Sequence, residues 1–443
     1  MDQRIVRTVW LSAFGAVLIV PVLVRLATAP SEPLWKQLSV VTGLLALSAL
    51  VCAAVLPSRV RSLTRAFGIE NVLDVHRFLG TATGALVLVH LAFVVAADPA
   101  KVALLDFPAA GPAPRAATIS TLALGALIVL AVLRGRSRSS YEHWRWLHIA
   151  LAATVVGAGA LHVWYLDQLV TRPRMDAVYA LMAGLLLCVL VNRWLWRSLL
   201  DPTSEFVVRD VRRETPTVST LVLQPRSARH SRDAGWRFAP GQFAWLRLER
   251  SVTAQEHPFT IASSPHSDGS IEFTIRHAGD FTSGIPALLP GSQVWVDGPH
   301  GAFTSDDTLG GVVMIAGGVG VTPMMSMLRT AAHRGDRRAF RLVVVAGSRE
   351  DLLFRAELAD LRRQLDLEVT EVLRRPPAGW SGHTGEIGVG LLTAVLAGVG
   401  NCSVADLDYF LCGPPSLVLD ALDALGALDV PPDRVHTEQF EMV

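Results

Sequence analysis

The chain has 443 residues, of which 51% are hydrophobic, and its 40 Lys and Arg residues nearly balance its 39 Asp and Glu residues. Nucleic-acid-binding proteins carry a basic excess, so this balance argues against nucleic acid as a partner. The four cysteines form no Cys-x-x-Cys pair, which excludes a plant-type iron–sulfur module and a structural zinc site.

Six apolar runs occupy the first 200 residues. They lie at about residues 9–27, 38–56, 72–96, 118–133, 146–166 and 177–192. A stretch of about 20 apolar residues crosses a bilayer, so we expect residues 1–200 to form a six-helix transmembrane domain with the lipid bilayer as its surroundings. The first run could be mistaken for a signal peptide, but it is longer than the usual apolar region of such a peptide. We interpret it as a retained helix.

Arginines predict the orientation of these helices. They are concentrated on the flanks that share a side with the N-terminus, for example around Arg4 and Arg7, Arg59 to Arg65, and Arg134 to Arg138. Cytoplasmic flanks are enriched in Lys and Arg. We therefore expect a multi-pass protein of the plasma membrane, with both termini and the polar second half of the chain in the cytoplasm.

Two of the apolar runs carry the same pair of histidines. Thirteen residues separate His76 from His90, and thirteen separate His148 from His162. This spacing corresponds to about four helical turns and a rise of about 21 Å. Each pair therefore lies on one helix face, with one histidine near each membrane surface.

The repeated spacing decides between two interpretations of these histidines. A lone histidine in a membrane helix is usually a hydrogen-bonded packing residue, but ionisable groups at this depth are costly and usually functional. We predict that His76 and His148 ligate one b-type haem and that His90 and His162 ligate a second. Small residues on the same faces leave room for a flat macrocycle: Gly80, Gly84, Ala152 and Gly159.

Three further residues near the inner end have competing interpretations. His143 could replace His148, but it lies outside the apolar run and breaks the spacing, so we interpret it as a surface residue. Arg77 and Arg145 either pair with haem propionates or are ordinary positive flanking charges.

After Asp201 the pattern changes to short alternating strands separated by Gly and Pro turns. The strands are expected at residues 205–211, 218–225, 243–250, 271–277 and 292–299. Such spacing is typical of a small antiparallel β-barrel, which we place at residues 201–305. Hydroxyl groups, arginine and exposed amides suit a flavin and its pyrophosphate. The barrel offers them in His257-Pro258-Phe259-Thr260, in Arg276 and in Gly279-Asp280-Phe281-Thr282.

From about residue 306 the pattern is that of an α/β domain with a parallel sheet, which we place at residues 306–443. A buried strand is followed by the glycine turn 317–320 and by a helix in which Thr322 suits the cap and Pro323 the first turn. A second strand–helix unit, with its helix at 351–364, follows. A third strand ends in Cys412-Gly413-Pro414-Pro415, at the edge where open α/β sheets bind ligands.

These motifs, in this order, resemble the ferric reductase and NADPH oxidase family over nearly the full chain. The histidine pairs and HRFLG resemble its membrane domain, HPFT its flavin motif, GGVGVTP its nucleotide loop and FLCGPP the motif beside the nicotinamide. The resemblance implies a ferredoxin-reductase-type dehydrogenase that uses FAD and NAD(P)H and feeds electrons to two b-type haems.

The resemblance also implies roles for individual residues. FAD would be held by His257, Pro258, Phe259 and Thr260, with Arg276, Gly279 and Thr282 near its pyrophosphate. The dinucleotide would be held by Gly318, Gly320, Thr322 and Pro323, and its nicotinamide by Cys412, Gly413 and Pro414. Phe440 is the candidate to stack on the flavin, although three residues follow it. Arg349 resembles a contact to a 2′-phosphate, which favours NADPH over NADH.

The expected function is transmembrane electron transfer from cytosolic NAD(P)H to a small-molecule acceptor outside the cytoplasm. Ferric iron and oxygen, the latter giving superoxide, are both open, because nothing in the outer loops separates them. One alternative is an electron-donating subunit that serves quinone or a docked protein. Another is a haem transporter or sensor without enzymatic activity, against which the complete flavin and nucleotide motifs argue. No catalytic acid, base or nucleophile is expected, and no protein partner is indicated.

Overall fold

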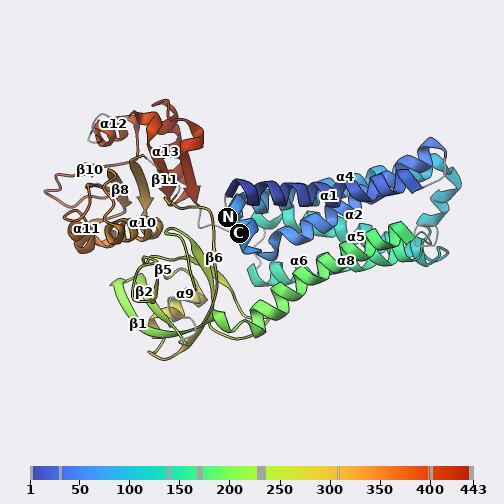
Figure 1. Cartoon of the computed structure of the whole chain (residues 1–443), viewed down its shortest axis with the longest axis horizontal. Coiled ribbons are helices and arrows are strands. Elements are labelled where there is room, and N and C mark those ends of the chain that lie inside the picture. The colour runs from blue at the N-terminus through green and yellow to red at the C-terminus, as the bar shows by residue number, and fades with distance from the viewer. Residues whose placement is uncertain are drawn as a thin grey trace. The chain divides into compact units, whose positions relative to one another are not determined.

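The computed structural model describes residues 3–28, 32–136, 141–166, 173–226, 236–306, 308, 310–397, 399 and 403–438. The chain forms two compact units, one extending to Trp196 and the other beginning at Arg197. The first consists of helices and the second contains two β-sheets (Figure 1).

Six helices among the described residues are long and apolar enough to cross a membrane, which confirms the six predicted runs. They are α1 (Gln3–Thr28), α2 (Leu34–Val55), α4 (Ile69–Ala97), α5 (Pro112–Val132), α6 (Tyr141–Trp164) and α8 (Pro173–Val191). The short helix α3 (Arg61–Phe67) lies between α2 and α4. Each long helix reaches beyond the run that predicted it at its N-terminal end, because polar residues at the membrane surface extend a helix without contributing to its hydropathy.

The helix α2 is the inner member of the membrane unit. Of its span, 56% is buried, against 6–17% for the other five. It packs along α4, while α5 packs along α6. Small residues such as Ala46, Ala49 and Ala53 are buried on α2 and let neighbouring backbones approach closely. The backbone of α2 is therefore within reach of side chains on α4.

The first sheet of the second unit is antiparallel, with the strand order β4-β3-β6-β1-β2-β5. Its strands are β1 (Glu205–Thr215), β2 (Val218–Pro225), β3 (Phe243–Arg247), β4 (His257–Thr260), β5 (Ile271–Arg276) and β6 (Gln293–His300). The two edge strands meet where Ile261 bridges Phe273 and Ala262 N donates to Glu272 O at 2.7 Å. The sheet thus curls into the predicted barrel. HPFT forms a further strand, β4, in addition to the five that were expected.

The second sheet is parallel, with the order β10-β9-β8-β7-β11-β12. Its strands are β7 (Val312–Gly317), β8 (Phe340–Ala346), β9 (Leu367–Leu373), β10 (His383–Thr384), β11 (Asp408–Cys412) and β12 (Val435–Glu438). One face is covered by α10 (Val321–Arg334) and α11 (Arg355–Leu361), the other by α12 (Val389–Ala397) and α13 (Pro415–Gly426). This arrangement confirms the predicted α/β domain with a parallel sheet.

The second predicted helix of this domain is shorter than expected. Residues 351–364 were predicted as helical, but α11 spans only Arg355–Leu361, after a short 3-10 turn η9 at Arg349–Asp351. Phe354, at the start of α11, has a positive φ of 58°, which an α-helix interior does not accommodate. Leu352 and Leu353 are buried in the core instead, so their apolar character reflects packing rather than helical periodicity.

The first residues of the second unit are bound to the barrel by two arginines. Arg247 of β3, only 1% exposed, donates to the carbonyls of Arg197 and Ser198, at 3.2 Å each. Arg250 donates through Nε to Leu199 O at 2.9 Å. These carbonyls lie at the end of the helical turn η4 (Asn192–Leu200), where helix carbonyls are bonded by groups from outside the helix. The two guanidinium groups serve this purpose.

Candidate cofactor sites

His76 on α4 and His148 on α6 face each other. Their ring centroids are 6.2 Å apart. Two metal–nitrogen bonds of about 2.0 Å and two imidazole half-rings together span about 6 Å. The separation therefore suits a metal ion held between the two rings.

Three of the four histidines place Nδ1 against a backbone carbonyl of a neighbouring helix. The contacts are His76 with Ala53 O at 2.8 Å, His90 with Ser39 O at 2.6 Å, and His162 with Ala113 O at 3.0 Å. A carbonyl accepts only, so Nδ1 carries the hydrogen and Nε2 keeps its lone pair, the arrangement that second-shell contacts impose on metal-ligating histidines. His148 Nδ1 is buried without a hydrogen-bond partner among the described residues.

Glycines around the histidines serve two different purposes. A Cβ placed at Gly80 would meet no atom within 4 Å, so space is available beside that turn of α4. A Cβ at Gly84 would lie 2.7 Å from Ile128 Cδ1, so this glycine permits helix packing instead. A Cβ at Gly43 on α2 would lie 3.1 Å from the ring of His90. Sequence reasoning missed Gly43, because only the pairing of α2 with α4 brings it to the histidine.

The neighbouring charged residues make local contacts. Arg77 Nη1 donates to Asp74 Oδ1 at 2.6 Å, with both side chains exposed. Arg145 lies over the ring of Trp146 and 3.5 Å from Glu142. The side chain of His143 is exposed. His148, not His143, is the residue that faces the ring of His76.

The flavin motif and the GDFT segment lie side by side. The rings of His257 and Phe281 are 4.4 Å apart, and Phe259 stacks on Phe281 with an angle of 16° between the planes. Thr260 pairs with Phe243 of β3, and its Oγ1 is buried without a partner in the part of the chain that the structure describes. A buried hydroxyl normally has a hydrogen-bond partner, so a ligand with a polar edge fits beside Thr260.

Thr282 closes a turn of its own segment. Its Oγ1 accepts from the amides of Ala278 and Gly279, at 2.9 and 3.0 Å, and donates to Gly279 O. Arg276, by contrast, is exposed at the end of β5 and lines a cavity. Contact of Thr282 and Gly279 with a pyrophosphate stays a prediction.

A cavity of about 310 Å³ lies between the barrel and the parallel sheet. The barrel lines it with Thr215, Thr217, Val218 and Arg276, and the sheet lines it with strand ends and loops, including Gly317, Gly318, Val319, Gly347 and Pro414. Arg374 and Arg375 also line it. Three arginines and a glycine turn suit a ligand with phosphate groups.

The glycines of the loop 317–320 differ in their surroundings. Gly318 has a φ of 55° and no atom within 4 Å of a Cβ placed there. A Cβ at Gly320 would lie 2.2 Å from Cys412 O, and one at Gly317 would lie 2.8 Å from Pro414 Cδ. The loop therefore packs backbone to backbone on the Cys412–Pro414 segment. Gly318 is the glycine that lines the cavity with open space beside it.

The predicted cap of the following helix is wrong. The helix α10 begins at Val321 and its N-cap is Gly320, without a side-chain cap. Thr322 Oγ1 donates to Val319 O at 2.8 Å and so stabilises the loop rather than the first amides of the helix. Pro323 lies in the first turn as predicted.

The remaining predicted residues are placed as follows. Cys412 ends β11, beside Ala316 of β7, and is buried. Arg349 is exposed in η9 and is not among the residues that line the cavity. Sequence reasoning missed Arg374 and Arg375, whose position at the carboxyl end of β9 follows only once β9 is recognised as a parallel strand. Phe440 lies outside the described residues.

Three segments match known families. Residues 42–159 match "Ferric reductase like transmembrane component", residues 218–304 match "FAD-binding domain", and residues 314–422 match "Oxidoreductase NAD-binding domain". The three matches occur in the order in which the fold presents a helical unit, a barrel and a parallel sheet.

Curated relatives match the second half of the chain. Ferredoxin--NADP reductase B of Sorangium cellulosum is 33% identical over 46% of this chain and 86% of its own length. The reductase component of propane 2-monooxygenase of Mycolicibacterium goodii is 30% identical over 46% of this chain. The chain spans only 59–65% of the length of this and two further monooxygenase reductase components.

Solved structures also resemble the chain in part. The FAD/NAD-binding domain of nitric oxide dioxygenase from Vibrio cholerae is 24% identical, with a TM-score of 0.45, and the match covers 53% of this chain and 98% of that one.

The matches give this protein an FAD-binding domain and an oxidoreductase NAD-binding domain, and the six apolar helices make it a multi-pass membrane protein. The chain is thus a ferric reductase-like transmembrane component fused to a dehydrogenase, and this dehydrogenase belongs to the ferredoxin–NADP reductase family.

Proposed function

We propose that this protein carries electrons from cytosolic NAD(P)H, through FAD and two b-type haems, to an acceptor on the other side of the membrane. The observation that carries the proposal is the pair His76 and His148, whose rings face each other at 6.2 Å. When bound, the nucleotide supplies a hydride, FAD divides its two electrons into single ones, and haem carries them singly.

The residues of the chain hold and orient these groups. His76 with His148, and His90 with His162, would hold the two haems, and the carbonyls of Ala53, Ser39 and Ala113 orient three of the rings. If haem is bound, two histidines would hold each iron, and the group would supply single-electron transfer.

The dehydrogenase half holds the other two cofactors. Thr260 offers its unpartnered hydroxyl to FAD, and His257, Pro258 and Phe259 accompany it on β4. The dinucleotide would occupy the cavity at Gly318, where Arg276, Arg374 and Arg375 would supply positive charge for its phosphates. Thr322, Pro323 and the Cys412–Pro414 segment support the loop that it contacts. The arginine-rich lining favours NADPH over NADH.

We further propose that the three domains span residues 1–200, 201–305 and 306–443. The termini and the dehydrogenase lie in the cytoplasm, because the arginine-rich flanks lie on that side. The membrane is the plasma membrane, and His76 and His148 are then the inner pair.

The acceptor is ferric iron or oxygen. A second candidate function, delivery of electrons to a docked protein, is supported by relatives whose names describe them as reductase components of monooxygenases.

One experiment tests the proposal and separates these acceptors. Purified full-length protein is given NADPH or NADH and then oxygen, a ferric chelate and a quinone in turn. We expect NAD(P)H oxidation coupled to reduction of oxygen or the ferric chelate, and haem in the purified protein. Protein that contains no haem, or that reduces neither acceptor while reducing quinone, would contradict the proposal.

A further inference from the structure

The helix that follows the glycine loop also contacts the barrel along its side. Ser326, Arg329 and Thr330 of α10 share one helix face, because residues three and four positions apart are neighbours. Ser326 Oγ donates to Ser263 O at 2.8 Å, and Thr330 Oγ1 lies 3.3 Å from Ser264 Oγ. Ser263 and Ser264 belong to the barrel, just after β4. This face of α10 is therefore a contact between the two domains of the second unit.

Arg329 joins both domains through one guanidinium group. Its Nε and Nη2 donate to the two carboxylate oxygens of Glu357 on α11, at 2.6 and 2.7 Å. Its Nη1 donates to Ala262 O at 2.8 Å and to Glu272 Oε2 on β5 at 3.0 Å. Glu357 lies in the same domain as Arg329, whereas Ala262 and Glu272 lie in the barrel. The bidentate pair holds the guanidinium plane in one orientation.

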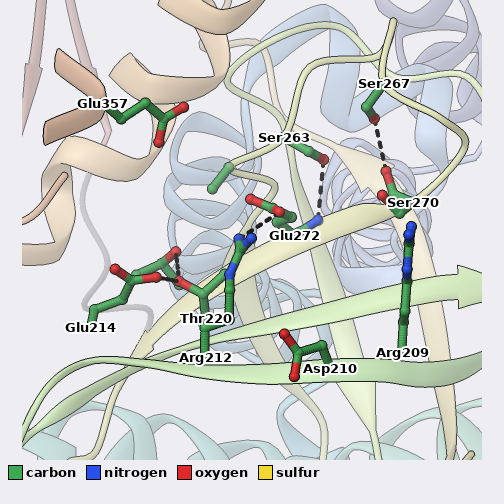
Figure 2. A network of polar contacts seen from close by, with 12 residues as sticks. Arg209, Asp210, Arg212, Glu214, Thr220, Ser263, Ser267, Ser270, Glu272 and Glu357 are labelled. Carbon is green, nitrogen blue, oxygen red and sulfur yellow. Dashed lines mark hydrogen bonds and ion pairs between the residues drawn. The ribbon is translucent and has the colours of Figure 1, made fainter. Parts of the chain in front are cut away.

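The barrel side of this contact is itself held in place. Glu272 Oε1 accepts from Arg212 Nη2 at 2.6 Å, and Glu272 N donates to Ser263 Oγ at 3.1 Å (Figure 2). Glu357 lies on the neighbouring helix in the same view (Figure 2). The segment that α10 binds is thus fixed to β5 by backbone and side chain together.

The guanidinium group of Arg329 stays protonated in this position. Its side chain is 13% exposed. Burial alone would lower the pKa of the guanidinium, but hydrogen bonding to Glu357 and the charges of Glu357 and Glu272 raise it above its usual value. The contact therefore persists at every pH at which the two carboxylates are ionised.

We infer that Arg329 is a positioning residue for hydride transfer. The segment Ala262–Ser264 begins two residues after Thr260 of the flavin motif, and α10 begins at the loop that lines the nucleotide cavity. Arg329 fixes these two elements relative to each other and so fixes the approach of the nicotinamide to the flavin. A misplacement of about 1 Å in a transfer reaction costs up to about 100-fold in rate. This role rests on one part of the proposed function, the reduction of FAD by NAD(P)H.

Two variants of the full-length protein form the central comparison. Glu272→Ala removes the carboxylate in the barrel, and Glu357→Ala removes the one in the same domain as Arg329, so each leaves the arginine one carboxylate besides the carbonyl of Ala262. First-turnover oxidation of NAD(P)H is measured at saturating nucleotide, together with nucleotide Kd, FAD content and Tm. We expect Glu272→Ala to slow this step about tenfold or more while Kd and FAD content stay unchanged. Glu357→Ala should leave the step nearly as fast as in the wild type.

Two further variants serve as a control for Glu272→Ala and as a replacement for it. Arg212→Ala controls for the second partner that Glu272→Ala removes, and it should leave the step unchanged. If Glu272→Ala loses FAD, Ser326→Ala replaces it, because this variant removes only one interdomain hydrogen bond and keeps all charges; the same slowing at unchanged Kd is expected.

The outcomes separate the inference from the proposed function. Equal slowing by Glu272→Ala and Glu357→Ala, or slowing that follows Tm alone, would show that the network is merely structural and would overturn the inference. Wild-type protein that fails to oxidise NAD(P)H would overturn the proposed function and the inference with it.

Discussion

At the scale of single residues, Gly318 and Gly320 of the nucleotide loop are not equivalent. Gly318 lines the cavity in a left-handed conformation with open space beside it, whereas Gly320 lies against the carbonyl of Cys412. The sequence pattern treats both as positions where backbone approaches a phosphate. Only the packing of the loop on the end of β11 separates the two, because a glycine has no side chain whose chemistry could report its contact.

The first prediction compares alanine at these two positions. Gly318→Ala should weaken nucleotide binding with a modest loss of stability, because a left-handed alanine costs about 1 kcal/mol. Gly320→Ala should lower Tm markedly, because its Cβ would meet Cys412 O at 2.2 Å. Nucleotide titration and thermal unfolding of both variants distinguish the effects. A Gly320→Ala protein with normal Tm and impaired binding would show that Gly320, too, faces the nucleotide.

The second prediction concerns the inner histidine pair. His148→Ala should remove one of two haems, because His76 would lose the ring that faces it. His143→Ala should leave both, because its side chain is exposed on the same helix. Haem content and the absorption spectrum of the purified variants provide the measurement. Equal haem loss in the two variants would show that the ligand was misassigned.

At the scale of elements, Arg247 ties the start of the dehydrogenase to β3. It is buried, lies 3.7 Å from Glu256 and satisfies two carbonyls at the end of η4. Its role could not be predicted from the sequence, since an arginine in the alternating strand 243–250 is expected to face solvent. The contact forms because the segment 197–200 folds back onto the barrel. A local sequence pattern cannot predict this, because the two segments are distant in the chain.

The third prediction uses a matched pair of arginines. Arg247→Met should destabilise the barrel by about 3–5 kcal/mol, because it breaks a buried ion pair by removing one of its charges. Arg250→Met should cost less than about 1 kcal/mol, because its side chain is largely exposed. Release of FAD during heating reports on the barrel alone. Similar shifts in the two variants would argue that burial of Arg247 has no energetic consequence.

At the scale of the whole molecule, the pattern of hydrophobic residues predicts the helices and sheets, whereas most side-chain contacts could not be predicted from the sequence. The six helices, the barrel and the parallel sheet follow from runs and alternations that each lie within a few dozen residues. Three features do not follow from such patterns: the contacts of Arg329, the position of Gly43 beside His90, and the positions of Arg374 and Arg375 at the cavity. They join residues that are far apart in the chain, and their types are common on any surface. Thr260 was identified because its motif is local.

The fourth prediction concerns the serial path across the membrane. His90→Ala touches only the proposed outer site, so NAD(P)H should still reduce FAD at nearly the wild-type rate while delivery to an external acceptor stops. Vesicles with the dehydrogenase accessible and the acceptor enclosed allow both rates to be measured on one sample. Delivery at the wild-type rate would show that electrons leave before the outer pair.

The carbonyls that orient His76 and His90 belong to Ala53 and Ser39 of α2. Thirteen residues separate these two positions, the same number that separates the histidines. Two backbone carbonyls of α2 therefore have the same separation as the two histidines of α4, in the reverse chain order. Backbone groups of α2, not its side chains, provide this match. A single residue inserted between Ser39 and Ala53 would rotate one carbonyl by about 100° relative to the other. One histidine would then lose its orienting partner although every histidine remained in place.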